Sequence, residues 1–482
     1  MKQLSQFDSV FVYNETPSHP LHISPILIYD TSECESTVRF KDILERFKER
    51  IHVTPVFRQK LIKVPFNLDS PYWIDDADFD LEFHVRHLSL PAPGDWRQFC
   101  ILLARLHSRP LDLNRPPWEA YIIEGLDNIN GMPPGAFAMY MKIHHSAIDG
   151  ATGNQIIEAL HDLAPNATAI LPEDTWQGEA PPSSFTLLKS AYVNALKSPK
   201  KALNVIKHGY KSRQEGKKGY NGKAFTSHDV KDRIRFNNAV SPHRVFGGFR
   251  VELEHIKLIK NAVGDCTVND VLLSIVGGAM RRYLYEKGEL PDNSLVAGVP
   301  ISVRTAENAN AEGGNQVAGM RLHLRTDIED PIERLRLINQ DAVGSKVYAN
   351  AIGVERMTTI VNTIPAGLAS LGMRVAAATH LAAKAPILHT IVTNVPGPQV
   401  PLYMAGAKAR LWLGAGCPLD GVGLFHTINS YYGSVAITFI CCRTMMPDPD
   451  VYHQCITSSF TELYNAAKTL SAANASEKAA IN

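Results

Sequence analysis

The chain has 482 residues, about three times the length of an ordinary domain of ~150 residues, so two large domains are expected and a single small module is excluded. Hydrophobic residues make up 45% and charged residues 20%, which supplies sizeable cores and argues against disorder over most of the chain. Because 49 Lys and Arg oppose 48 Asp and Glu, the net charge of +1 predicts no chain-wide affinity for nucleic acid.

The first 165 residues alternate between strand and helix patterns. Strands are predicted over residues 22–30, 118–126 and 136–145. Apolar residues at helical spacing predict helices over residues 36–51 and 152–163. A turn rich in Gly, Pro and Asn joins the second and third strands, so these two are expected to be neighbours. The pattern is typical of a mixed α/β domain.

The composition changes between residues 166 and 249. From Lys189 to Arg235 there are 13 Lys and Arg against three Asp and Glu. The rest of the chain carries 36 basic and 45 acidic residues. The net charge of +1 is therefore the sum of +10 in this segment and −9 in the rest of the chain. We expect a connection between domains, whose lysines either face water as a solvated linker or contact anionic lipid or CoA phosphates.

Residues 250–482 return to mixed structure and predict a second α/β domain. Strands are expected over residues 294–304, 316–325 and 387–395, with a hairpin over residues 428–442 that turns at residues 432–434. Helices are expected over residues 268–288 and 453–482.

The run KIHHSAIDG, residues 142–150, holds the residues best suited to chemistry. If the strand over residues 136–145 keeps its alternation, His145 lies on the apolar face and His144 on the opposite face. An imidazole with apolar neighbours and little water is disfavoured as a cation, so His145 is expected to be a neutral base near pH 7. Asp149 either orients the site or caps the helix that follows.

On these residues alone, a catalytic and a structural role both stay open. A His-His pair is most often structural, and Asp-Gly is a common turn dipeptide. A metal site is disfavoured, because adjacent strand histidines point to opposite faces and no third or fourth ligand follows at a recognised spacing. We therefore expect no metal.

HHSAIDG, residues 144–150, resembles the HHxxxDG motif of the CoA-dependent acyltransferase superfamily, which includes chloramphenicol acetyltransferase and the condensation domains of peptide synthetases. More narrowly, the chain is similar from end to end to the bacterial wax ester synthase/acyl-CoA:diacylglycerol acyltransferase family. The segments that carry the likeness are LSQFDSVFVYNETPSHPLHI, PLDLNRPPWEAYIIEGL, TVNDVLL, VPISVR, TNVPGPQVPLYMAGAK and INSYYGSVAITF. Pro117 stands where the family usually has a bulky apolar residue, and such departures leave the preferred acyl acceptor undecided.

The resemblance implies two α/β domains of chloramphenicol acetyltransferase type, joined by a long crossover, with the active site in a channel between them. Residues 1–165 would be the N-terminal domain with the motif, residues 166–249 the crossover and residues 250–482 the C-terminal domain. The implied reaction is transfer of a fatty acyl group from acyl-CoA to a long-chain alcohol or diacylglycerol. His145 would be the general base, with His144 beside it in the catalytic motif and no acyl-enzyme.

Five further residues complete the site that the resemblance implies. Gly150 gives the motif loop its tight turn, and Asp149 holds the loop in shape. Asn269 either donates to the thioester oxyanion or caps the helix that follows. Arg304 either anchors the second domain or meets a CoA phosphate, and Trp118 either lines the acyl channel or belongs to the core.

Localisation and partners follow from the same patterns. Seven cysteines, an odd number without a C-x-x-C pair, exclude zinc ribbons and redox pairs. There is no apolar leader and no stretch of ~18 apolar residues, so we expect a cytoplasmic protein with peripheral contact to the inner membrane face or lipid inclusions. The expected partners are acyl-CoA, fatty alcohol or diacylglycerol and a lipid surface, without cofactor or nucleic acid, and a homodimer is left open.

Two alternative functions are kept. One is a condensation-type acyltransferase that uses a carrier-protein thioester, and the other is a non-catalytic protein of the lipid-droplet surface. If the surface contact exists, the basic segment from Lys189 to Arg235 is the predicted contact with anionic lipid. The apolar residues expected to insert shallowly beside it are Phe185, Leu187, Leu188, Tyr192 and Val193.

Overall fold

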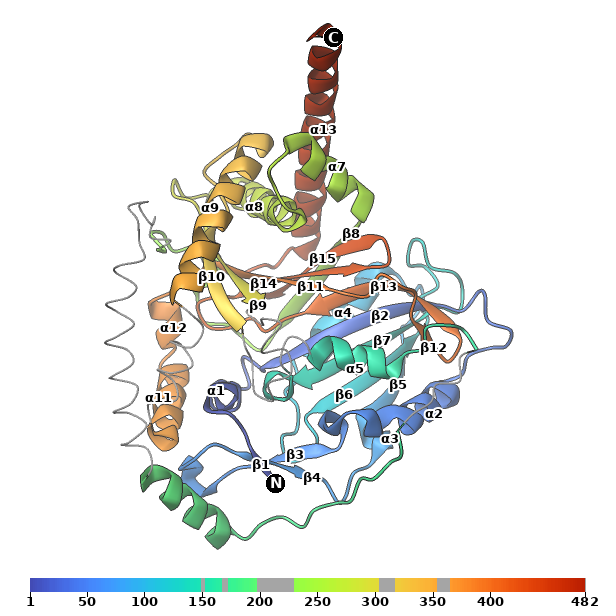
Figure 1. The fold of residues 1–482 in the computed structure, drawn as a ribbon, viewed down its shortest axis with the longest axis vertical. Helices are drawn as coiled ribbons and strands as arrows, with labels where there is room; N and C mark the ends of the chain where they lie inside the picture. The colour runs from blue at the N-terminus through green and yellow to red at the C-terminus, as the bar shows by residue number, and fades with distance from the viewer. Residues whose placement is uncertain (149–151, 167–171, 197–228, 303–316, 353–364, 482) are drawn as a thin grey trace.

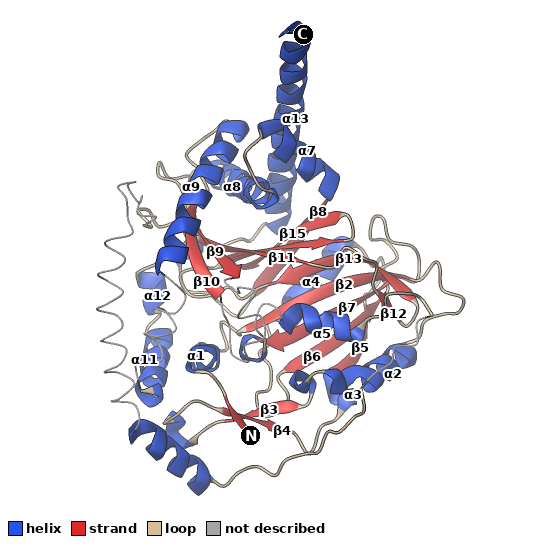
Figure 2. Ribbon diagram, in the orientation of Figure 1, coloured by secondary structure: helices blue, strands red, loops and turns tan. Residues whose placement is uncertain are grey.

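The computed structural model describes residues 1–148, 152–166, 172–196, 229–302, 317–352 and 365–481. Within these ranges the strands form two six-stranded sheets and one three-stranded sheet. The two large sheets lie next to each other, and helices gather on their outer sides (Figure 1; Figure 2). The mixed α/β architecture that the sequence predicts is confirmed.

The first large sheet takes most of its strands from the N-terminal half of the chain. In spatial order these are β12 (Tyr403–Met404), β13 (Ala407–Ala415), β2 (His22–Asp30), β7 (Phe137–His144), β6 (Trp118–Glu124) and β5 (Val85–Ser89). One face packs on α2 (Phe40–Arg50) and α5 (Thr152–Leu160), and the other packs on α4 (Trp96–His107). Because both faces are covered, β7 is buried along its whole length.

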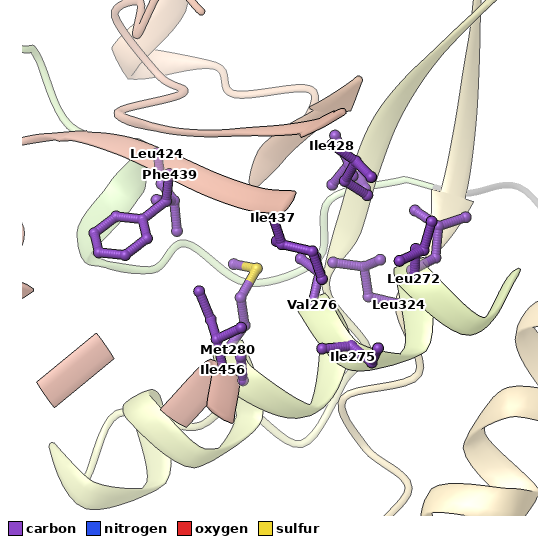
Figure 3. Close-up of a cluster of buried hydrophobic side chains, with 14 of the residues drawn as sticks. Leu272, Ile275, Val276, Met280, Leu324, Leu424, Ile428, Ile437, Phe439 and Ile456 are labelled. Carbon is purple, nitrogen blue, oxygen red and sulfur yellow. The ribbon is translucent and has the colours of Figure 1, made fainter. Parts of the chain in front are cut away.

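The second large sheet comes from the C-terminal half. Its spatial order is β10 (Val317–His323), β9 (Val296–Ser302), β11 (Thr390–Pro396), β14 (Leu424–Tyr431), β15 (Ser434–Cys442) and β8 (Arg244–Glu252). The helices packed on it are α7 (Leu253–Val263), α8 (Val268–Glu286), α9 (Pro331–Ile352) and α13 (Pro449–Ile481). Figure 3 shows side chains of α8, such as Val276 and Met280, beside Ile437 of β15 in this core.

The predicted hairpin over residues 428–442 is confirmed as β14 and β15. Its two turn residues, Tyr432 and Gly433, have φ angles of 40° and 82°, as a two-residue turn between twisted antiparallel strands requires. The helix predicted over residues 36–51 begins later, at Phe40, because the Asp42 carboxylate accepts a hydrogen bond from the Arg39 amide at 2.9 Å and so fixes the first turn there.

Strand β13 joins the two halves of the chain. It comes from the C-terminal half but pairs antiparallel with β2, so that Trp412 lies opposite Leu27 in the first sheet. Thr438 of β15 donates to the Gly414 carbonyl at 2.6 Å, which fastens β13 to the second sheet as well. β13 comes after residue 250 in the chain but belongs to the first sheet, and β8 belongs to the second sheet but begins before residue 250, at Arg244. The two sheets therefore do not divide the chain at residue 250.

The remaining elements surround the two large sheets. The small sheet has the order β1 (Lys2–Gln3), β4 (Tyr72–Asp75) and β3 (Gln59–Ile62). The other helices are α1 (Gln6–Asn14), α3 (Leu81–His84), α11 (Ala366–Ala378), α12 (Leu381–Lys384) and one over residues 184–196. Short 3-10 turns are η1 (Ile51–Val53), η2 (Pro55–Phe57), η3 (Pro65–Asn67), η4 (His145–Ala147) and η5 (Arg235–Asn237). In the described part of the chain, no single helix is long and apolar enough to cross a membrane; α7 and α8 meet that test only as a pair bent by 98°.

Two helical glycines offer a test of the packing of α8. A Cβ on Gly277 would overlap the Leu324 carbonyl oxygen, whereas a Cβ on Gly344 of α9 would meet nothing within 4 Å. We expect Gly277→Ala to destabilise the protein by about 1–3 kcal/mol through overpacking. Gly344→Ala should stabilise it by up to about 1 kcal/mol, because alanine is the better helix former. The unfolding temperatures of the two variants, compared with that of the wild type, check this. A higher unfolding temperature for Gly277→Ala would contradict the close packing of α8 against Leu324.

Candidate active site

The two motif histidines lie at the end of β7, where two backbone hydrogen bonds hold them. The His144 amide donates to the Pro117 carbonyl at 2.9 Å, and the His145 amide donates to the Leu21 carbonyl at 2.8 Å. β7 ends at His144, and His145 begins the turn η4. The strand predicted to reach residue 145 is therefore one residue too long, and His145 does not continue the strand alternation.

His144 points into the protein and is fully buried. Its Nδ1 atom accepts a hydrogen bond from the Ser146 amide at 3.2 Å and lies 2.7 Å from the Ser146 hydroxyl. Because an amide only donates, Nδ1 is the unprotonated nitrogen, and a neutral His144 carries its proton on Nε2. Nε2 lies 3.7 Å from a carboxylate oxygen of Glu15.

Glu15 follows the end of α1 and ties that helix to the motif. Its Oε1 atom accepts a hydrogen bond from the Leu21 amide at 3.1 Å, while Oε2 faces His144. Burial alone would raise the pKa of Glu15, but the neighbouring His144 imidazole and the Leu21 amide hold the pKa below its usual value. Glu15 is therefore a charged carboxylate at neutral pH, placed where it fixes the orientation of His144.

His145 lies on the other side of the motif, against α1. Its ring stacks on Phe11 with a centroid distance of 4.0 Å and an angle of 7° between the planes. Burial lowers the pKa of His145 to about 4, and the neighbouring His144 adds to the effect. The imidazole is therefore neutral at pH 7 and able to accept a proton. The expected apolar surroundings are present, but Phe11 provides them in place of the β7 face.

A buried polar cluster supports the first sheet beside His144. His22 of β2 lies opposite His144 in the strand register, and its ring is 4.4 Å from that of His107. His107 is 3.0 Å from the Tyr140 hydroxyl and 2.7 Å from the Gly416 carbonyl. Burial lowers the pKa of His107 to about 3 and the pKa of His22 well below its usual value, so both rings are neutral. The cluster fixes the strand ends without adding positive charge.

Of the other predicted residues, Asn269 and Trp118 are described, and the rest lie outside the described residues. Asn269 is not the cap of α8, because Thr267 occupies that position and exchanges hydrogen bonds with Asp270. Its amide oxygen accepts instead from Asn394 of β11 at 3.2 Å. Trp118 is a buried core residue that donates to the Phe57 carbonyl at 2.9 Å. The positions outside the described residues are Asp149, Gly150 and Arg304.

Phe11 and Glu15 are the site residues that the sequence analysis missed. They are four residues apart, so a helix over this segment places them on one face. That spacing was visible in the opening segment LSQFDSVFVYNETP, but it does not indicate which other segment the face contacts. The contact depends on the position of η4, which packs on α1 and follows directly from β7 of the first sheet.

Comparison with known proteins identifies the family. The model of the wax ester synthase/diacylglycerol acyltransferase catalytic domain matches residues 4–272, and that of the corresponding C-terminal domain matches residues 313–464. The chain belongs to the wax ester synthase/diacylglycerol acyltransferase family. It is 30% identical over 462 residues to a putative diacylglycerol O-acyltransferase of Mycobacterium tuberculosis strain CDC 1551, across 93% of this chain and 87% of that protein.

Solved structures share the fold of this chain. A wax ester synthase/diacylglycerol acyltransferase from Marinobacter aquaeolei VT8 has a similar fold, with a TM-score of 0.69 at 24% identity over 97% of this chain and 100% of that one. The starter condensation domain of rhizomide synthetase is more distant, with a TM-score of 0.51 at 14% identity over 97% and 94% of the two chains. The predicted family and the predicted acyltransferase class are confirmed, and the chain is an acyltransferase.

The stacking of Phe11 on His145 predicts a measurable change in pKa. Phe11→Ala should admit water to the imidazole, so the pKa of His145 should rise from about 4 toward its usual value. NMR titration of ¹⁵N-histidine-labelled protein measures this directly. Phe40→Ala is the matched control, because Phe40 stacks in the same way on a different histidine, His87, with a centroid distance of 4.8 Å and an angle of 3° between the planes. This control should leave the titration of His145 unchanged. An unchanged His145 titration in Phe11→Ala would show that the stacking does not exclude water.

Proposed function

We propose that this acyltransferase moves a fatty acyl group from acyl-CoA to the hydroxyl of a long-chain alcohol or diacylglycerol, forming a wax ester or a triacylglycerol. Family membership supports the reaction class. The observation that carries the mechanism is His145, a neutral imidazole held by its backbone at the end of β7 and shielded by Phe11. Such a group accepts a proton without first having to lose one.

His145 acts as the general base. Its Nδ1 atom is buried, so Nε2 is the nitrogen offered to the alcohol. Nε2 takes the hydroxyl proton as the alcohol oxygen attacks the thioester carbonyl, and a tetrahedral intermediate forms. The carbon–sulfur bond then breaks, the ester leaves, and the CoA thiolate takes the proton from the imidazolium. No acyl-enzyme forms, so both substrates are bound together and gain from being held in place.

His144 and Glu15 position the base. The Ser146 and Glu15 contacts fix the His144 ring, and the adjacent backbone carries His145. Asn269 supports the developing negative charge on the thioester oxygen: its own amide oxygen already accepts from Asn394, so its NH₂ group is the side that donates. In this proposal Asp149 and Gly150 shape the motif loop, and Arg304 meets a CoA phosphate or anchors the second domain.

The enzyme works where its lipid substrates are. Long-chain alcohols, diacylglycerol and their esters partition into membranes or oil, so we place the protein in the cytoplasm, attached peripherally to the inner membrane face or to lipid inclusions. Acyl-CoA reaches it from the water phase. The chemistry proposed for His145 needs neither a metal ion nor a bound cofactor.

Substitution of His145 tests the base. We expect His145→Ala to lower turnover by about 10²- to 10⁴-fold, because it removes the proton acceptor and leaves both substrate sites. The assay follows release of CoA from acyl-CoA, first with fatty alcohol and then with diacylglycerol, and a carrier-protein thioester as donor tests the condensation-type alternative. His87→Ala, on β5 and partly exposed, is the control. Equal turnover by wild type and His145→Ala would overturn the mechanism.

The pH profile is a second test. The base is lost as the pH falls through the pKa of His145, which is about 4, so turnover should stay constant from pH 7 down to about pH 5. An imidazole in water would lose half of its basic form near pH ~6.5. The profile is measured at saturating substrate, with return to pH 7 to verify that losses are reversible. A reversible midpoint near pH ~6.5 would contradict a shielded His145.

A further inference from the structure

Large apolar side chains are exposed on three neighbouring segments. They are η3, the helix over residues 184–196 and α11, and we call the face that they share the apolar surface. Its main side chains are Phe66, Phe185, Tyr192, Leu196, Leu368 and Leu371. Phe66 is 85% exposed and Phe185 is 77% exposed. An exposed patch of this kind on a protein marks a contact with a partner or a membrane.

The three segments are packed together. Leu187 and Ala191 of the helix over residues 184–196 form a small core with Val64, just before η3, and with Tyr72. On the other side of η3, α11 approaches so closely that a Cβ on Gly367 would lie 3.1 Å from the Leu68 carbonyl oxygen. In the view of Figure 1, the helix over residues 184–196 appears below the end of α11. Both helices therefore contact the η3 segment, and their exposed side chains lie on adjoining parts of the protein.

The exposed positions follow the geometry of each segment. The helix over residues 184–196 buries Leu187 and presents Phe185 and Tyr192 to solvent, so its outer face is apolar as well as its inner face. Leu187, which was expected to insert into lipid, is therefore a core residue. On α11 the exposed residues Leu368, Leu371 and Val375 are three and four residues apart and form one stripe. Phe66 has a φ of 59°, a left-handed conformation that costs energy and turns its ring outward.

The segments that form the apolar surface carry formal charge of one sign. Residues 62–68, 184–196 and 366–384 contain no Asp or Glu. Their formal charges are Lys63, Lys189, Arg374 and Lys384, and all four are exposed. A second copy of the chain, docked symmetrically on this face, would bring these cations against their own copies. An anionic lipid layer instead offers an apolar interior for the aromatic and leucine side chains and negative headgroups for the cations.

The apolar surface is also connected to the motif. α11 packs on α1, and α1 packs on η4, which begins with His145. We infer that the apolar surface docks on an anionic lipid layer and that the lipid-soluble acyl acceptor enters from that layer along the α1 side of the site. The acceptor part of this inference rests on the proposed function, whereas the docking part does not.

Vesicle binding by the full chain tests the docking. Vesicles of phosphatidylcholine with phosphatidylglycerol are compared with vesicles of phosphatidylcholine alone, by co-sedimentation. The triple variant Phe66→Ser/Leu368→Ser/Leu371→Ser should bind the anionic vesicles about tenfold more weakly than the wild type. The control variant Tyr285→Ser/Val343→Ser removes two exposed apolar side chains from α8 and α9 and should bind like the wild type. All of these positions are exposed, so unfolding temperatures should stay the same.

Electrostatic attraction is tested separately. The variant Lys189→Gln/Arg374→Gln/Lys384→Gln should lose most of the salt dependence of binding to anionic vesicles. Equal vesicle binding by the triple apolar variant and the wild type would overturn the inference. Failure of the wild type to bind anionic vesicles would also overturn it. A triple variant that changes from dimer to monomer, with unchanged vesicle binding, would overturn it too, because the surface would then join two copies of the chain.

Activity distinguishes the docking from the chemistry. With a long-chain alcohol or diacylglycerol carried in vesicles, the triple apolar variant should turn over about tenfold more slowly than the wild type, in line with its binding. With a short, water-soluble alcohol, the two should be equal. His145→Ala should bind vesicles normally and remain inactive with both acceptors. If the wild type is inactive with every acceptor while vesicle binding follows the expected pattern, the proposed function fails and the docking surface stands.

Discussion

Two backbone hydrogen bonds at the end of β7 determine the geometry of the site. The amides of His144 and His145 donate to the carbonyls of Pro117 and Leu21, which belong to segments on either side of β7. Successive amides of an interior strand point to opposite neighbours, so these two bonds carry the sheet pattern to His145, where the turn η4 begins. One imidazole then turns into the protein and the next turns toward α1. The main chain fixes this arrangement, so it does not depend on the side chain at Pro117.

Charge near the motif is arranged so that His145 stays neutral. Lys142 lies on β7 and is buried; burial lowers its pKa to about 8, although Glu119 at 3.6 Å favours the cation. Glu15 stays ionised because His144 and a backbone amide compensate its burial. His145 has the stacked ring of Phe11 on one side, and a ring gives no hydrogen bond that would stabilise an imidazolium. The carboxylate thus acts on His144, and His145 keeps its low proton affinity.

Local patterns predicted much of the fold, and nonlocal contacts decided what they missed. The strand over residues 22–30 agrees with β2 at both ends, and the capping pair Thr267 and Asp270 could have been recognised from the T-x-x-D spacing, which would have excluded Asn269 as the cap. The place of β13 in the first sheet follows from pairing with β2, a strand almost 400 residues earlier in the chain. No periodicity within one segment contains that information, and the same holds for Phe11 against His145.

The two sides of His145 differ in how firmly they are held. On the motif side, the imidazole is attached to a strand that is buried along its length and hydrogen bonded to both neighbours. On the other side stands Phe11, carried by α1, a nine-residue helix that lies between η4 and α11. A shift of α11 would therefore reach the ring of Phe11 before it reached the strand. If His145 is the base, as proposed, differences in acceptor among relatives with the same motif are expected on the α1 and α11 side, where the wall can change without disturbing the position of His145.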